Sequence, residues 1–242
     1  MTEAEWLACE DPQRMLYSLR ESLSARKLRL FAVACAGQVR RLLSDQRGQA
    51  ALAFAEKHGA EVARRQGRQA IEVAAQRARN EAYHQTAAAP AGVEQARWRA
   101  AANALDAAAQ CVGTDAFNAA RYSASFSAFA GAWAAQLAAG LTSSRELEEE
   151  FVLAEQERQV CFLRDLVGND RRHVAVERRW LTETVAALAE AVYTDRAFDR
   201  LPILADALED AGCTDRAMLD HCRQPGEHAR GCWVVDLVLG KE

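Results

Sequence analysis

The feature that most constrains this chain is a stretch rich in alanine, in which 23 of the 53 residues from 87 to 139 are alanine. Alanine has the strongest intrinsic preference for the α-helix and only a methyl group with which to fill a core. Small residues at helical spacing let neighbouring helices approach closely. The stretch therefore predicts two closely packed helices, at about 93–112 and 115–140, with the second at the centre of the fold.

The rest of the composition favours the same fold class. The chain has 242 residues, of which 50% are apolar and 26% charged, with only four prolines and 13 glycines. That is too few turn residues for a β-sandwich or barrel. We expect an all-α protein, a multi-helix bundle or irregular α-array of about eight to ten helices. Its parts would be an N-terminal helical region (1–86), alanine-rich central helices (87–168) and a C-terminal helical region (174–242), as separate domains or as one.

Capping signals predict where several helices begin. Thr2 and Glu5 have the spacing of a capping box, Asp11 precedes Pro12 as N-cap and first helical residue, and Ser24 precedes a basic and apolar run. The C-terminal region shows helical patterns at about 180–193, 197–211, 214–223 and 231–239.

Residues 122–144 carry no charge and are numerous enough to span a bilayer. Alanine and serine dominate this segment, and no cluster of lysine and arginine flanks it. A buried core helix is therefore favoured over a membrane segment, and a membrane partner is not expected. The first residues, MTEAEWLACEDPQRM, lack the basic and apolar runs of a secretory signal, which predicts a cytoplasmic protein with reduced thiols.

Charge gives little support for a nucleic-acid partner. The net charge is −4, so no overall field attracts a polyanion. Glutamates interleave with a run of arginines in a way that favours a salt-bridged helix face over a phosphate-binding stripe. The run comprises Arg64, Arg65, Arg68, Arg77 and Arg79, to which the Arg171–Arg172 pair could add.

The segment CTDRAMLDHCRQPGEHARGCW, residues 213–233, concentrates potential metal ligands. Zinc requires four ligands from Cys, His, Asp or Glu, usually with one close pair such as C-x2-C. The candidates are Cys213, Cys222, His228 and Cys232, but their spacing contains no close pair. His221 and Cys222 are adjacent, and on a helix they would point about 100° apart. The spacing therefore favours packing over a zinc site.

On the packing interpretation each cysteine has its own apolar surroundings. Cys213 follows a glycine at a helix end, Cys222 shares an apolar face with Leu219, and Cys232 begins a last helix that docks on the core through Trp233. The ligand atoms should then scatter. Three of them within about 5 Å of one another would instead indicate a metal site whose ion is absent. A weaker third hypothesis treats GEHARG as an anion pocket.

Four blocks of sequence resemble a known family: TEAEWLACEDPQRML, RKLRLFAVAC, DRAFDRLPILADALEDAGC and GEHARGCWVVDLVLGKE. They look like blocks of a large paralogous family of bacterial proteins that is abundant in planctomycetes. The segment from Arg200 to Gly212 is similar to the signature of the bacterial repeat-companion domain, except that Ala207 stands where that domain has tryptophan. The resemblance implies an all-helical cytoplasmic protein and transfers no catalytic or ligand residues.

No catalytic or nucleotide-binding motif of recognised type occurs in the sequence, so neither an enzyme nor a cofactor is expected. The leading hypothesis is a non-enzymatic interaction module that binds a protein partner or itself. The alternatives are a metal-binding protein that uses the C-terminal cysteines and histidines and, more weakly, a nucleic-acid-binding protein.

Overall fold

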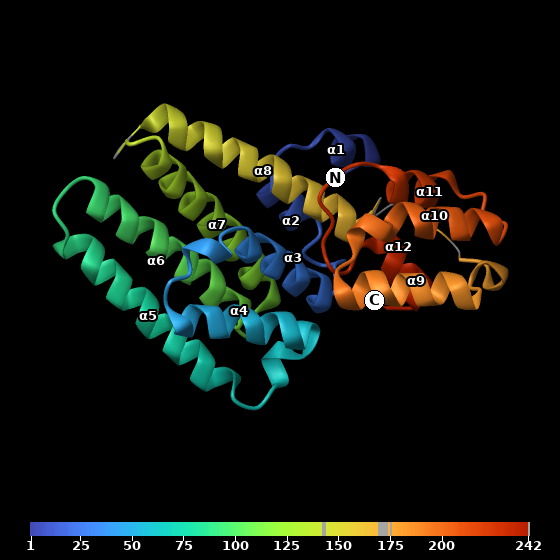
Figure 1. Ribbon diagram of the computed structural model, residues 1–242, viewed down its shortest axis with the longest axis horizontal. Helices are drawn as coiled ribbons and strands as arrows, with labels where there is room; N and C mark the ends of the chain where they lie inside the picture. Colours follow the sequence, from blue (N-terminus) through green and yellow to red (C-terminus); the bar gives the residue numbers. More distant parts are fainter. Residues whose placement is uncertain (142–143, 169–173, 175, 242) are drawn as a thin grey trace. The chain divides into compact units, whose positions relative to one another are not determined.

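The computed structural model of the chain describes residues 1–141, 144–168, 174 and 176–241, and every regular element in these residues is helical. Twelve α-helices and four short 3₁₀ helices occur within this described part (Figure 1). The all-α class is therefore confirmed, while the expected eight to ten helices is too few. Short helices lie near both ends of the chain: α1, α2, α11 and α12 have six to eight residues each.

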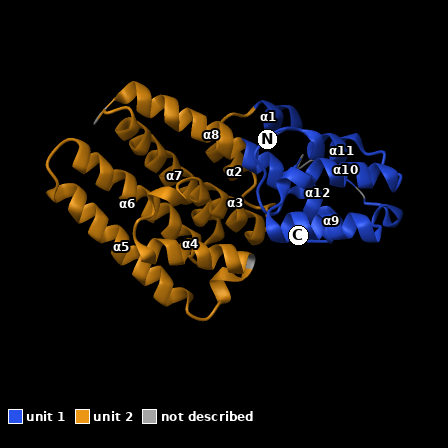
Figure 2. Ribbon diagram, viewed as in Figure 1, with its two compact units in different colours: residues 1–8, 161–242 blue, residues 9–160 orange. Residues whose placement is uncertain are grey.

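The chain forms two compact units (Figure 2). Unit 2 is residues 9–160, and unit 1 combines residues 1–8 with residues 161–242. This division differs from the three regions expected from composition. The change in composition near residue 87 lies inside unit 2, because the helices on either side of it pack against each other.

Unit 2 contains the long helices. In chain order they are α2 (Pro12–Ser18), α3 (Ala25–Gln38), α4 (Gln46–His58), α5 (Arg68–Ala88), α6 (Val93–Cys111), α7 (Ala116–Ala138) and most of α8 (Arg145–Val167), with the 3₁₀ helices η1 (Arg40–Leu42) and η2 (Gly59–Arg64). Helix α7 packs along both α6 and α3, and α6 also packs along α5. The expectation that the helix near 115–140 is central holds for this unit.

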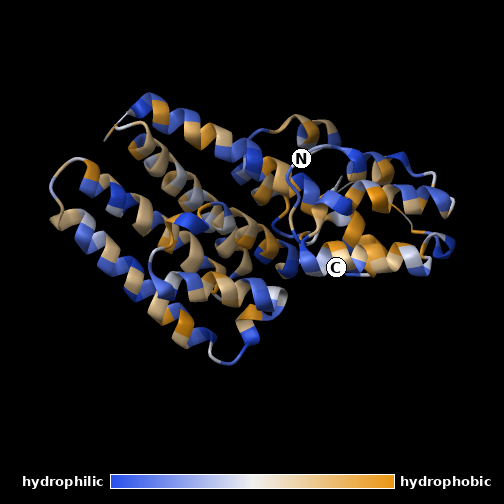
Figure 3. Cartoon of the chain, in the orientation of Figure 1, coloured by the Kyte–Doolittle hydropathy of each residue, from blue (hydrophilic) through white to orange (hydrophobic). Residues whose placement is uncertain are grey.

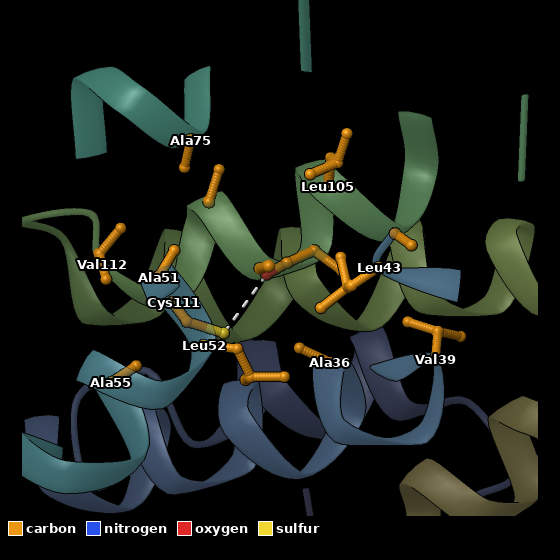
Figure 4. Close-up of a cluster of buried hydrophobic side chains, with 14 of the residues drawn as sticks. Ala36, Val39, Leu43, Ala51, Leu52, Ala55, Ala75, Leu105, Cys111 and Val112 are labelled. Atoms are coloured by element: carbon orange, nitrogen blue, oxygen red, sulfur yellow. Dashed lines mark hydrogen bonds between the residues drawn. The ribbon is translucent and has the colours of Figure 1, made fainter. Parts of the chain in front are cut away.

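Alanine fills most of the core of unit 2. Among the 21 buried residues that form this cluster in the described chain, 14 are alanine. Leu52, Leu105 and Val112 supply the larger side chains between the helices (Figure 4). Close packing of methyl groups requires long helices that run side by side, because each contact removes little apolar surface from water.

Helix α7 also buries polar side chains among its alanines. Ser123, Ser127 and Gln136 are fully buried. The Gln159 amide of α8 donates hydrogen bonds to the Ala124 carbonyl (2.9 Å) and to the Ser127 hydroxyl (3.4 Å). In the part of the chain that is described, no helix is both long enough and apolar enough to cross a membrane.

Unit 1 is built from short helices and 3₁₀ turns: α1 (Glu3–Ala8), the end of α8, η3 (Arg178–Trp180), α9 (Glu183–Asp195), η4 (Phe198–Arg200), α10 (Leu201–Asp210), α11 (Arg216–Arg223) and α12 (Trp233–Leu239). Its core consists of larger side chains than that of unit 2, among them Leu201, Leu204, Leu208 and Met218. Figure 3 shows saturated orange along α9 and α10, whereas α7 has the paler colour of alanine and serine.

The predicted caps form as expected. The Thr2 amide donates to the Glu5 carboxylate (2.7 Å) and the Glu5 amide to the Thr2 hydroxyl (3.2 Å), which is a complete capping box. The Asp11 side chain accepts from the first amides of α2, and Ser24 caps α3. These local signals depend on neighbours in sequence alone, which is why they could be predicted.

Candidate metal centre

Four segments of unit 1 bring potential metal ligands to one place. Asp165 lies in the last turn of α8, and His221 lies in the last turn of α11. His228 belongs to the loop between α11 and α12, and Cys232 is the N-cap residue of α12. One ligand atom from each of the four residues lies within 4.8 Å of the ligand atom of every other.

The closest contacts centre on one carboxylate oxygen and one imidazole nitrogen. Asp165 Oδ1 is 2.5 Å from His228 Nδ1 and 3.1 Å from His221 Nε2. The same His221 nitrogen is 3.2 Å from the sulfur of Cys232. Two nitrogens, an oxygen and a sulfur from four segments of the chain therefore converge.

Asp165 is fixed by contacts to both of its carboxylate oxygens. While Oδ1 faces the histidines, Oδ2 accepts a hydrogen bond of 2.8 Å from the Ala229 amide. Burial on its own would raise the pKa of Asp165, but hydrogen bonds from His221 and His228 outweigh it and hold the pKa below its usual value. The carboxylate is consequently charged at neutral pH and is oriented by the loop that carries His228.

Aromatic rings surround the two histidines. The Trp233 ring lies 5.4 Å from the His221 ring, and the Phe198 ring lies 6.2 Å from the His228 ring. Trp233 also packs against Gly168, where an added Cβ would lie 2.9 Å from the indole. Trp233 is only half-buried, so α12 docks mainly through its buried valines, Val234, Val235 and Val238.

The geometry does not suit a cysteine nucleophile with a histidine base. In such a triad one imidazole nitrogen faces the nucleophile while the other faces the carboxylate. Here Nε2 of His221 faces both the Cys232 sulfur and Asp165 Oδ1. Cys232 is also only 1% exposed, which closes it to a substrate. The arrangement suits a small ion held between the groups better than a proton relay.

The structure brings together two of the four metal ligands named from the sequence. His228 and Cys232 belong to the cluster, whereas Cys213 and Cys222 do not. Both of the excluded cysteines are buried in the apolar core of unit 1. Burial raises the pKa of Cys222 to about 12 and that of Cys232 well above its usual value, so position and not acidity distinguishes the two thiols.

The expectation that the ligand atoms scatter is wrong. His221, His228 and Cys232 lie within the limit of about 5 Å at which we set the packing interpretation aside. The missing close pair misled the sequence argument, because the four residues of the cluster come from separate segments of the chain and not from one local clamp. His221 belongs to the cluster and Cys222 does not, as expected for adjacent helical residues that point in different directions.

Sequence reasoning missed Asp165, although a signal was present. Its neighbours Phe162, Leu163 and Leu166 are buried, so the aspartate lies on an apolar part of the helix. It also lies in the last turn of α8, where a negative charge is unfavourable next to the helix carbonyls. A buried carboxylate in that position requires a cationic partner.

The arginine run forms ion pairs, as the interleaved glutamates indicated. Arg65 pairs with Glu61, Arg68 with Glu72 at 2.5 Å, and Arg79 with Asp106 at 3.2 Å. Arg68 additionally donates to the Val112 carbonyl at the end of α6.

These contacts engage three of the five arginines of the run and reduce what it could offer to a phosphate backbone. The Arg171–Arg172 pair lies outside the described residues.

Comparisons with protein-family models, with curated proteins and with solved structures found no match to this chain.

Proposed function

We propose that unit 1 binds one zinc ion through Asp165, His221, His228 and Cys232, and that the ion has a structural role. The observation that supports this proposal is the convergence of four ligand atoms within 4.8 Å. In a tetrahedral zinc site, bonds of about 2.0–2.3 Å place the ligand atoms roughly 3.3–3.8 Å apart. The separations between ligand atoms in the cluster lie on both sides of that range, so shifts of about 1 Å would bring the atoms to tetrahedral spacing.

The donor set favours zinc over other common ions. Two imidazoles, a thiolate and a carboxylate are ligands that zinc accepts in proteins. Calcium and magnesium take oxygen ligands almost exclusively, and this cluster offers them one carboxylate. With Asp165 and Cys232 ionised and both histidines neutral, the ligands carry two negative charges that a divalent cation balances.

A structural role follows from the burial and the number of the ligands. Four protein ligands complete a tetrahedral shell, and they leave no position for a water or a substrate. The side chains are buried or nearly so, with exposed fractions of 4% for Asp165, 10% for His228 and 17% for His221. The Ala229 amide on Asp165 Oδ2 supplies the outer hydrogen bond that orients such ligands.

Elemental analysis of protein purified without a histidine tag tests the proposal. We expect about one equivalent of zinc per chain, and less than about a tenth of an equivalent would overturn it. Cys232→Ser should lose most of the zinc. The matched control is Cys222→Ser, a buried cysteine ten residues away that is outside the cluster, and it should retain the metal.

Cobalt substitution tests the ligands themselves. Cobalt(II) in a tetrahedral site with one thiolate shows strong visible bands and a sulfur-to-cobalt charge-transfer band in the near ultraviolet. We expect the charge-transfer band in the wild-type protein and in Cys222→Ser, but not in Cys232→Ser. Weak visible bands typical of an octahedral ion in all three proteins would contradict a tetrahedral site with a thiolate.

The interaction module is a second proposal, supported by apolar side chains that unit 2 leaves exposed. Phe129 of α7 and Phe151 and Leu153 of α8 are 42%, 40% and 60% exposed. Burial of these groups would favour a homo-oligomer or a protein partner. Light scattering on the purified protein tests self-association. A mass above the 26.6 kDa of one chain, together with a lower mass for the double variant Phe129→Ser, Phe151→Ser, would support a homo-oligomer. A monomeric wild-type protein would rule the homo-oligomer out.

A further inference from the structure

Helix α1 belongs to unit 1 although more than 150 residues separate it from the rest of that unit (Figure 2). Trp6 is its buried residue, at 4% exposed. The Trp6 indole nitrogen donates a hydrogen bond of 3.1 Å to the Gly168 carbonyl. The Arg164 guanidinium donates to the carbonyls of Leu7 (2.7 Å) and Trp6 (3.4 Å) at the end of α1. The end of α8 is therefore the docking site of α1.

The stretch of chain that holds α1, residues 164–168, also carries the cluster residue Asp165. Asp165 lies between the two positions that hold α1, Arg164 and Gly168. Gly168 has a φ of +66°, and the Trp233 indole packs directly against its Cα. Trp233 follows the ligand Cys232 and lies against the ring of the ligand His221. A continuous set of contacts thus joins the cluster to Trp6.

We propose that zinc binding and the docking of α1 are linked, so that the ion controls whether residues 1–8 are docked on unit 1 or released from it. The inference rests on the zinc site proposed above and names what that site regulates. With zinc bound, Asp165 and Cys232 are fixed, and Arg164, Gly168 and Trp233 keep the positions that α1 requires. Without zinc those positions are no longer fixed, and a six-residue helix does not remain formed in isolation.

Linkage is reciprocal, so a change in α1 must alter the affinity for zinc by the same factor by which zinc alters the docking of α1. We expect Trp6→Ala to weaken zinc binding at least about tenfold, which corresponds to about 1.4 kcal/mol. Trp6→Phe keeps the ring and loses the hydrogen bond to Gly168, and it should have a smaller effect. Competition with a chromophoric chelator measures each affinity.

Two control variants separate this link from a general loss of stability. Leu7→Ala changes a residue of the same helix that is 59% exposed, and Val185→Ala changes a fully buried residue of α9 that has no part in the contacts described. Both should bind zinc as the wild type does while unit 1 remains folded. If Val185→Ala weakened zinc binding as much as Trp6→Ala does, the link would be overturned.

Hydrogen exchange on the unsubstituted protein provides a test that does not depend on any variant folding. The backbone amides of α1 should exchange more slowly with zinc than with a chelator. Equal exchange rates in a protein that does bind zinc would overturn the link and leave the zinc site standing. A protein that binds no zinc would remove both proposals, and elemental analysis of the same sample distinguishes these outcomes.

Discussion

The two units reach a buried core by different means. The core cluster of unit 2 has 14 alanines among its 21 buried residues in the described chain, carried by helices of 13–23 residues. The corresponding cluster of unit 1 has two alanines among 16 residues, and its helices α9–α12 have 7–13 residues. One unit combines long helices with small side chains, and the other combines short helices with large ones.

The difference predicts where each unit is sensitive. A short helix is marginal in isolation, so unit 1 depends on a few large side chains and on ties between segments. The cluster of Asp165 with His221, His228 and Cys232 is such a tie, because it joins segments that lie up to 67 residues apart. Unit 2 distributes its stability over many methyl contacts, so it should tolerate the loss of any one of them and suffer when a side chain is enlarged.

The largest expected effect is the loss of the buried carboxylate of unit 1. Asp165→Ala should destabilise unit 1 by about 3–5 kcal/mol, since the substitution leaves the other members of a buried charged cluster without their partner. Unit 2 should keep its stability. Denaturation followed by amide exchange in α9–α10 and, separately, in α5–α6 measures the two units in one experiment.

Asp106 of α6 provides the matched control for this prediction. It is a buried carboxylate of unit 2 that accepts hydrogen bonds from Tyr83 (2.7 Å) and Arg79 (3.2 Å). Asp106→Ala should destabilise unit 2 to the same extent with zinc or with a chelator, whereas zinc should stabilise unit 1 only when Asp165 is present. If the chelator weakened both units equally, the contrast between them would fail.

A second prediction compares the removal of side-chain volume. Leu208 of α10 is fully buried in unit 1, and Leu208→Ala should cost about 2–5 kcal/mol. Ala107 of α6 is fully buried in unit 2, and Ala107→Gly should cost only about 1 kcal/mol, most of it from the lower helix propensity of glycine. Urea denaturation of both variants checks this order, and a larger loss for Ala107→Gly would contradict it.

Enlarging a buried side chain should affect unit 2 more than shortening one does. Ala107→Leu adds three carbon atoms where α6 lies close to its neighbours, and we expect unit 2 to lose about 1–3 kcal/mol by overpacking. Ala138, near the exposed end of α7, is the control, and Ala138→Leu should change the stability by less than about 0.5 kcal/mol. Thermal denaturation of the pair is sufficient, and an equal effect at both positions would show that close helix approach is not what limits unit 2.

Much of the fold could be predicted because its signals are local. The capping box of Thr2 and Glu5, the Asp11–Pro12 start of α2 and the Ser24 cap of α3 depend on residues within one turn of each other. The long alanine-rich helices follow from propensity in the same way. Their arrangement in units does not, since residues 1–8 join residues 161–242 through contacts that no local pattern encodes.

The candidate site was predicted in part for the same physical reason. His228 and Cys232 were identified because they lie in one dense segment of the sequence. Asp165 was not, because it lies 56 residues before His221, and only the tertiary fold brings the two within 3.1 Å. Cys213 and Cys222 share the segment with the true members of the cluster but point into the apolar core. Proximity in sequence therefore selected two residues that lie outside the cluster and left out two of its members, Asp165 and His221.

The smallest expected effect concerns exposed charges of unit 2. Arg47 donates hydrogen bonds to Asp45 (2.7 Å) and Glu81 (2.5 Å) on its surface, and these bonds lower the pKa of both carboxyl groups. Because the folded-state pKa values lie below the unfolded ones, the contribution to stability is present at neutral pH. It disappears as the pH falls through the folded-state values. Arg47→Met should therefore lower the stability of unit 2 slightly at pH 7 and leave it unchanged in acid.

Salt separates this surface network from the buried cluster of unit 1. At about 1 M salt the screening length falls to about 3 Å, so the difference between Arg47→Met and the wild type should vanish. The effect of Asp165→Ala should persist, because its charges are shielded from solvent. Arg41, an exposed arginine with no ion pair among the described residues, is the control, and Arg41→Met should show no dependence on pH or salt. An effect of Arg47→Met as large as that of Asp165→Ala would mean that unit 2 also depends on individual charged groups, and the contrast between the units would then rest on side-chain volume alone.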